Sequence, residues 1–174
     1  MPQNIRNILR YEFITITDVP AGGPGIYNFG PGDGQAQRDY QNACAGIMHA
    51  QNSRSFWDRL ARSVNLNRVA RCHGATAYAA RQLQSYAGAN GLRLLICGVV
   101  DRDHHLLVVT DDAGVNAGGT VHAHAINNAI IADLWQYNLT RQLTGGIALA
   151  QLADTVANHL YTAGNPQLRI YVDF

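Results

Sequence analysis

Apolar residues recur every three or four positions in two segments of the chain, a pattern that predicts two amphipathic helices. In residues 52–64, NSRSFWDRLARSV, the side chains of Phe56, Leu60 and Val64 fall on one stripe. In residues 71–87, which begin RCHGATAYAARQL, the recurring residues are mostly alanine, and the turn sequence GANG follows. Small residues allow close approach, so we expect this second helix to lie flat against a sheet.

Other segments carry the apolar and β-branched runs of strands. They read LRLLICGVV, HHLLVVT, TVHAHAI, NAIIADLW and QLRIYVDF, and they begin at residues 92, 104, 120, 128 and 167. Short turns separate the first three runs, and DDAGVNAGG (111–119) is typical of a hairpin loop. These runs predict an antiparallel meander. With the helices they predict an α+β fold, in which helices pack on an antiparallel sheet.

The length of 174 residues suits one domain. We expect a single domain over residues 1–174, in which residues 1–34 form an N-terminal arm of one strand and a Gly/Pro-rich loop. Further helices are expected over residues 35–50 and 145–164. Residues 35–174 would form the core of the domain.

Composition excludes several classes of protein. The net charge of +1 gives no electrostatic footprint for nucleic acid, and no apolar run approaches the ~20 residues of a membrane helix. The N-terminus lacks the apolar stretch of a secretory signal peptide. The three cysteines show no CxxC spacing. We therefore expect no nucleic-acid partner, no membrane partner, no metal and no cofactor.

Cys72 is the first candidate for chemistry, because it stands at the start of the alanine-rich helix, next to Arg71. Unpaired N–H groups at a helix N-terminus favour a thiolate and can also bind an oxyanion. A thiolate nucleophile needs a base, and the base needs an orienting group. His104 and His105 open one predicted strand and Asp133 ends another, so a sheet edge could bring them to Cys72. The alternative is a structural cysteine that merely begins a helix.

Neighbouring residues on a strand face opposite ways, so only one of His104 and His105 is expected to face Cys72. We favour His105 as the base and keep His104 as the alternative. His73 follows Cys72 on the helix and is expected to point away from it. His122 and His124 would share one strand face, which makes them a second choice of base and a weaker candidate for a metal pair.

The segments CHGATAYAARQL, HLLVV and IIADLW, in that order, resemble the papain-like fold of bacterial toxins and effectors, which includes cysteine proteases and glutamine deamidases. The resemblance implies a Cys72–His105–Asp133 triad in a catalytic core. It also implies an amide oxyanion donor shortly before the cysteine, for which Asn67 is the candidate. Trp135 would cover the contact between aspartate and histidine. Many members read Asp-Pro-Trp where this chain has Asp133-Leu134-Trp135.

The resemblance implies an enzyme that hydrolyses carboxamides, either a glutamine side chain or a peptide bond, in a protein of a host or rival cell. It implies synthesis in a bacterial cytoplasm and delivery by a specialised secretion system, with a secretion chaperone or immunity protein as further partners. All 13 basic residues are arginine. A chain without lysine has no side-chain ubiquitin acceptor, although genomic base composition also explains this bias.

Two other functions remain open. A Cys-His-Asp set also serves acyltransferases and transglutaminases, which form the same thioester. A non-enzymatic adaptor or inhibitor would instead keep Cys72 as a structural, slowly reacting thiol.

Overall fold

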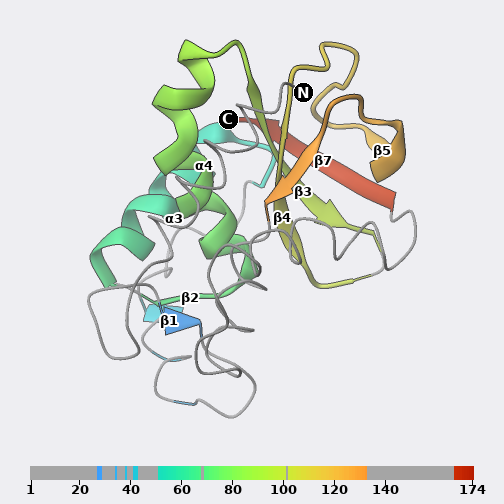
Figure 1. Ribbon diagram of the computed structural model, residues 1–174. Coiled ribbons are helices and arrows are strands. Elements are labelled where there is room, and N and C mark those ends of the chain that lie inside the picture. Colours follow the sequence, from blue (N-terminus) through green and yellow to red (C-terminus); the bar gives the residue numbers. More distant parts are fainter. Residues whose placement is uncertain are drawn as a thin grey trace, which may run out of the picture.

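The computed structural model describes residues 27–28, 34, 38, 41–42, 51–67, 69–100, 102–132 and 167–174. In these residues two long helices, α3 (Arg54–Asn67) and α4 (Cys72–Ala89), accompany a five-stranded antiparallel sheet (Figure 1). The helices pack against each other, and α4 also lies against β3 and β4 of the sheet. The expected α+β class is therefore confirmed.

The order of the strands differs from the expected meander. The strands are β3 (Arg93–Val99), β4 (His105–Thr110), β5 (Thr120–His122), β6 (Ile130–Ala132) and β7 (Gln167–Asp173), arranged β5-β7-β3-β4-β6. The C-terminal strand β7 thus lies between β5 and β3, and the loop 111–119 is not a hairpin. In a meander β3 would lie at the edge of the sheet with unpaired backbone groups, and pairing with β7 gives it a second neighbour.

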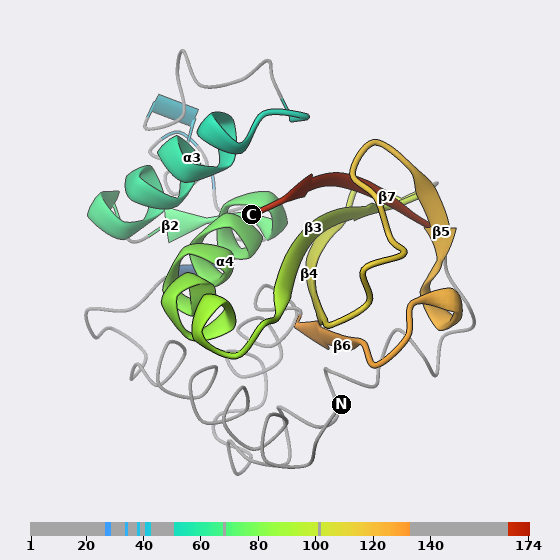
Figure 2. The same cartoon turned by 90° about the horizontal axis from the view of Figure 1, so that it is seen from above.

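Two apolar clusters lie on opposite faces of the sheet. Figure 2 shows α4 on one side of β3 and β4, and the connection from β4 to β5 on the other. On the helix side, the predicted stripe of Phe56, Leu60 and Val64 is buried against α4 and the sheet. On the far side, the connection from β4 to β5 and the residues after β5 cover the sheet, with Val115 and Ile126 among the buried side chains. The sheet is therefore a central layer between α4 and this connection.

The remaining expectations have mixed outcomes. The predicted strand over 120–126 ends at His122, after which Ala123–Ala125 form a 3-10 turn. A short parallel pair joins β1 (Tyr27–Asn28) to β2 (Val69–Ala70). Of the expected helix over 35–50, residues 38, 41 and 42 are described, and all three are helical. The expected helix over 145–164 and the N-terminal strand lie outside the described residues, and the single-domain organisation stays a prediction.

Among the described residues, no helix combines the length and the apolar character that crossing a membrane requires.

Candidate functional site

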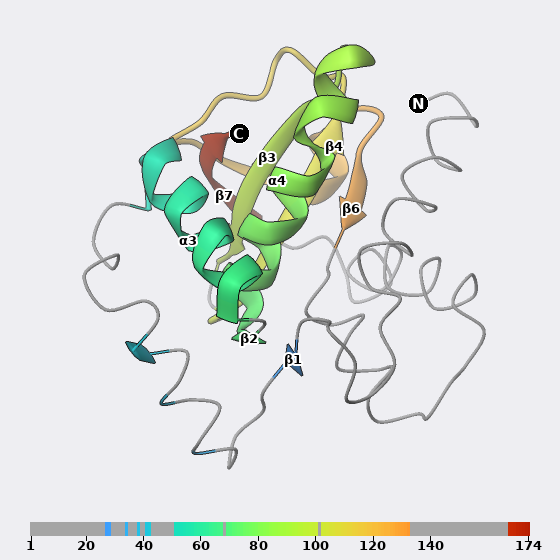
Figure 3. The same ribbon diagram turned by 90° about the vertical axis from the view of Figure 1, so that its left-hand side faces the viewer.

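The helix α4 and the strand β3 that follows it have similar lengths. The chain therefore returns along β3 to the end of the helix where α4 began, and the candidate site lies there. α4 has 18 residues, which span about 27 Å at the rise of an α-helix. β3 has seven residues, and its run of about 23 Å brings the chain back toward the start of α4 (Figure 3). The turn that follows β3 therefore delivers the first residue of β4, His105, beside the first residue of α4, Cys72.

Cys72 and His105 are in contact. The Sγ atom of Cys72 lies 3.8 Å from Nδ1 of His105, and the same sulfur lies 3.8 Å from the carbonyl oxygen of Asp103. Both side chains are buried, with 8% and 9% of their surface exposed. The protonated thiol can donate to the Asp103 carbonyl, whereas the thiolate can accept a hydrogen bond from the imidazole. The two groups are thus arranged for proton exchange once the sulfur and the nitrogen approach each other more closely.

The surroundings of Cys72 favour its thiolate. Burial alone raises the pKa of this thiol, but hydrogen bonds from the side chains of His104, His105 and His73, together with the charge of His105, lower the pKa to about 4. The helix start adds to this effect, because no side chain of the N-cap residue Arg71 bonds the first turn and no acidic residue lies there. The first-turn N–H groups are therefore suited to an anion.

His73 does not point away from Cys72, so that expectation is wrong. The rings of His73 and His105 lie 5.8 Å apart, and side-chain atoms of His73, Cys72 and His105 all lie within 4.8 Å of one another. Side chains of a helix tilt toward its N-terminus, so both residues of the first turn reach toward the open end of α4. His104 also contacts the thiol, because it precedes β4 and strand alternation does not govern it.

Tyr171 stacks on the imidazole of His105. Their ring centroids are 5.5 Å apart, with an angle of 26° between the planes. The register between β3 and β7 shifts between Ile96 and Cys97, and Tyr171 is the extra residue of this bulge. The ring lies across Gly98, the partner of His105 in the ladder, where a Cβ atom would stand 2.8 Å from the tyrosine ring. Only glycine at this position leaves room for the stack.

A tryptophan also lies against His105, but it is Trp57 of α3. It is fully buried, its ring lies 5.8 Å from that of His105, and its Nε1 donates a hydrogen bond to the carbonyl of Gln51 at 2.6 Å. Sequence reasoning assigned a covering tryptophan at residue 135, which lies outside the described residues. Trp57, Tyr171 and Gly98 were missed. An isolated glycine within the apolar run LLICGVV was the available signal, since such a glycine often marks a bulge or close approach.

The other ring nitrogen of His105, Nε2, is buried and has no hydrogen-bond partner among the described residues. Buried polar atoms are nearly always satisfied. A histidine whose Nδ1 faces a thiol and whose Nε2 lacks an acceptor therefore needs a further group, and Nε2 is the atom to which an orienting carboxylate would bind.

The remaining predicted residues are placed as follows. Asp133 lies outside the described residues, directly after β6. Asn67 ends α3, and its side chain is not described. His122 is exposed on β5, three strand spacings or about 14 Å from β4, and His124 follows in the 3-10 turn rather than on the strand. The structure thus does not bring His122 to Cys72.

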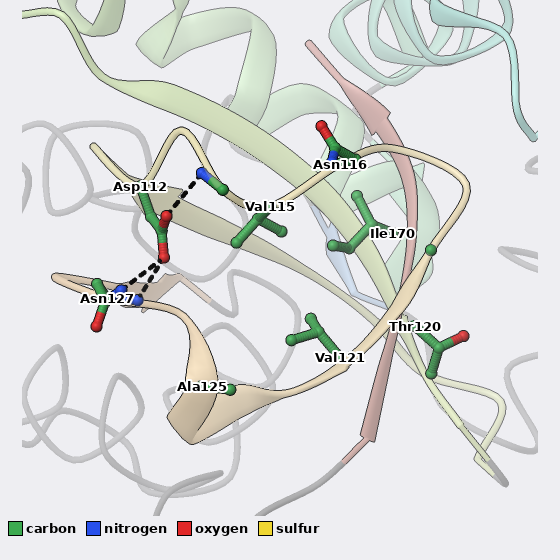
Figure 4. Close-up of a pocket in the computed structure, with 10 residues that line it drawn as sticks. Asp112, Val115, Asn116, Thr120, Val121, Ala125, Asn127 and Ile170 are labelled. Carbon is green, nitrogen blue, oxygen red and sulfur yellow. Dashed lines mark hydrogen bonds between the residues drawn. The ribbon is translucent and has the colours of Figure 1, made fainter.

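A cavity of about 460 Å³ lies on the far side of the sheet (Figure 4). Val115 and Ile170, which line it, belong to the apolar cluster opposite α4. The Asp112 carboxylate at its rim accepts hydrogen bonds from the backbone of Gly114 and from the backbone and side chain of Asn127. This carboxylate therefore holds its own loops together, and the sheet separates the cavity from Cys72.

Comparison of the chain with protein-family models, with curated proteins and with solved structures finds no match.

The two described cysteines should differ sharply in their reaction with iodoacetamide. With a pKa of about 4, Cys72 is thiolate at neutral pH, so its alkylation rate should stay nearly constant as the pH rises from about 6 and fall only in acid. Burial raises the pKa of Cys97, which should react only after unfolding. Mass spectrometry of the labelled peptides measures both rates, with Cys72→Ser as the control. Equal, slow labelling at both sites would contradict the described environment of Cys72.

The close approach of Tyr171 to Gly98 can be tested by a double-mutant cycle. Gly98→Ala should lower the free energy of unfolding by about 1–3 kcal/mol, because the new methyl group displaces the tyrosine ring. In a Tyr171→Ala background the same change should cost less, with a coupling of about 0.5–3 kcal/mol. Urea denaturation measures all four variants. An equal cost in both backgrounds would mean that the ring does not lie over Gly98.

Proposed function

We propose that this chain is a thiol-dependent amide hydrolase of papain-like architecture, with Cys72 as nucleophile and His105 as general base. The single observation that carries the proposal is the contact of 3.8 Å between Cys72 Sγ and His105 Nδ1, formed by residues 33 positions apart in the chain. This contact pairs a nucleophile with a base within reach of proton transfer. The N-terminus of α4 adds donors for an oxyanion at the same point.

The reaction proceeds through a thioester. The Cys72 thiolate attacks the carbon of a carboxamide, and the N–H groups at the start of α4 stabilise the oxygen anion that forms. The His105 imidazolium gives its proton to the nitrogen, which leaves as ammonia or an amine. Water then attacks the thioester, and His105 takes a proton from that water. The products are a carboxylate, the released amine and the free thiol.

Burial of the site supports this chemistry in a second way. Cys72, His105 and Trp57 are buried, and Tyr171 packs flat on the imidazole. The neighbouring rings of Trp57 and Tyr171 both pack on the imidazole and restrict its rotation, so Nδ1 stays directed at the sulfur. Low exposure also strengthens the attraction between thiolate and imidazolium. Trp57 and Tyr171 are thus positioning residues in the proposed reaction.

Asp133 is the proposed orienting group for Nε2 of His105. In the ladder, the last described residue of β6, Ala132, stands opposite Leu107, two residues along β4 from His105. Asp133 is the next residue, so its Cα lies within about 3.8 Å of that of Ala132. A regular continuation would place Asp133 opposite Leu106, on the face away from His105. The triad therefore requires the chain to leave the ladder, or to bulge, after Ala132.

The preferred substrate is a glutamine side chain of a protein in a target cell, and a peptide bond is the alternative. The family resemblance supports this choice, together with delivery by a specialised secretion system. Acyl transfer to an amine would use the same thioester and differs only in what attacks it. Acyl transfer is distinguished from hydrolysis by the group that attacks the thioester, and deamidation from proteolysis by the amide that is attacked. An assay therefore has to measure the products of all three reactions.

Incubation with an unfolded protein mixture should distinguish the three reactions. Ammonia release indicates deamidation, new N-termini indicate proteolysis, and incorporation of a labelled primary amine indicates acyl transfer. We expect ammonia release that falls more than about a thousandfold in Cys72→Ser and His105→Ala, because each removes a reacting group. Cys97→Ser is the matched control and should keep the activity, since that thiol lies on the far side of the sheet. If the wild-type chain produces no more of the three products than Cys72→Ser, the chain is not an enzyme of this kind.

Asp133→Asn tests the orienting role separately. The amide keeps the size of the side chain but loses its charge, so hydrolysis should fall by up to about 10⁴-fold. Alkylation of Cys72 should persist, because three histidines still contact the thiol. Asp111→Asn, at an exposed aspartate after β4, is the control and should leave the rate unchanged. Full activity in Asp133→Asn would show that another acceptor serves Nε2.

A further inference from the structure

Three ligands that soft metal ions prefer converge at the open end of α4. The Sγ atom of Cys72 and one ring nitrogen each of His73 and His105 all lie within 4.8 Å of one another. Cys72 and His105 are buried and His73 is half-buried, so the cluster is close to the surface on one side only. Thiolate and imidazole together are typical ligands of Zn²⁺ and related ions.

The distances fit one tetrahedral ion. With bonds of about 2.3 Å to sulfur and about 2.0–2.1 Å to nitrogen, two such ligands of one Zn²⁺ ion stand about 3.6 Å apart. The distance from Cys72 Sγ to His105 Nδ1 is 3.8 Å, so this pair needs only a few tenths of an ångström of movement. His73 stands on the adjacent position of the same helical turn, where a side-chain rotation brings its nitrogen into the third position.

We propose that Cys72, His73 and His105 bind one thiophilic divalent cation of the Zn²⁺ class in an exchangeable site. Three protein ligands leave the fourth position for water, unlike the closed four-ligand sets of structural zinc sites. His105 would bind through Nδ1, and its buried Nε2, which lacks a partner among the described residues, would donate to an outer-shell acceptor. The binding itself does not depend on the chain being a hydrolase.

The bound ion blocks the proposed reaction, and this consequence rests on the proposed function. An ion on Sγ occupies the electron pair that would attack carbon, and an ion on Nδ1 prevents that nitrogen from taking a proton. Binding needs the Cys72 thiolate and a neutral His105 imidazole, so it releases the proton that this pair holds and leaves the oxidation state of the ion unchanged. The site therefore acts as a reversible off-switch set by the free concentration of zinc. His73 is the distinguishing residue, because it has no step in the proposed hydrolysis.

Titration of the full-length, reduced and metal-stripped chain with Co²⁺ tests the site directly. We expect one ion per chain, with a thiolate-to-cobalt charge-transfer band that Zn²⁺ abolishes by displacement. Cys72→Ser should lose the band. His73→Ala and His73→Gln should weaken binding by more than the roughly 10- to 100-fold that loss of an outer-shell partner costs. His122→Ala removes an exposed histidine elsewhere on the sheet and should change nothing.

The same variants separate the site from the enzyme. Zn²⁺ should slow the alkylation of Cys72 in the wild-type chain, but much less in His73→Ala, which keeps both groups of the proposed catalytic pair. Absence of the band, or an equal band in His73→Ala and His73→Gln, overturns the three-ligand site. A normal band in a chain that hydrolyses no amide in the presence of chelator would refute the hydrolase alone. If the chain hydrolyses amides but neither binds Zn²⁺ nor is inhibited by it, the metal site alone would be refuted.

Discussion

The site depends on the packing of α4 along β3 and β4. Most alanines of α4 are fully buried in the apolar cluster that the helix shares with α3 and the sheet, and small side chains let the helix axis approach its neighbours closely. Because helix and strand are of similar length, the start of α4 and the start of β4 meet at the same end of the contact. A helix that stood further from the sheet would leave Cys72 and His105 out of reach of each other, whatever their identity.

The packing of α4 on the sheet sets the backbone position of His105, and the aromatic side chains around it set the orientation of its ring. Tyr171 reaches the imidazole because a bulge in β7 and the absence of a side chain at Gly98 act together. Trp57 arrives from α3, which an ion pair between Asp58 and Arg81 joins to α4. The position of the His105 ring thus depends on β7, β3 and α3 together. A base held in this way suits a thiol nucleophile, and the same rigidity fixes a ligand for a soft cation, so the two proposed roles have a common geometric origin.

Periodicity and turn residues were sufficient to predict the helix stripe of Phe56, the start of α4 near Cys72 and the five strand segments of the sheet. Strand order was not predictable, because the insertion of β7 beside β3 depends on long-range pairing that local sequence does not encode. The direction of His73 was misjudged because spacing along a helix does not describe its first turn, where side chains lean past the helix end. Tyr171 was missed for a related reason, since only the register shift brings it to His105.

Cys72 and Cys97 show why residue type alone could not identify the proposed nucleophile. Both thiols are buried, and burial raises the pKa of each. At Cys97 nothing opposes this effect strongly enough, because the residue lies mid-strand in an apolar cluster. At Cys72 three imidazoles and the start of a helix oppose it, and the thiolate becomes the favoured form. Reactivity therefore follows from the tertiary contact between α4 and β4 rather than from the number of cysteines or their spacing.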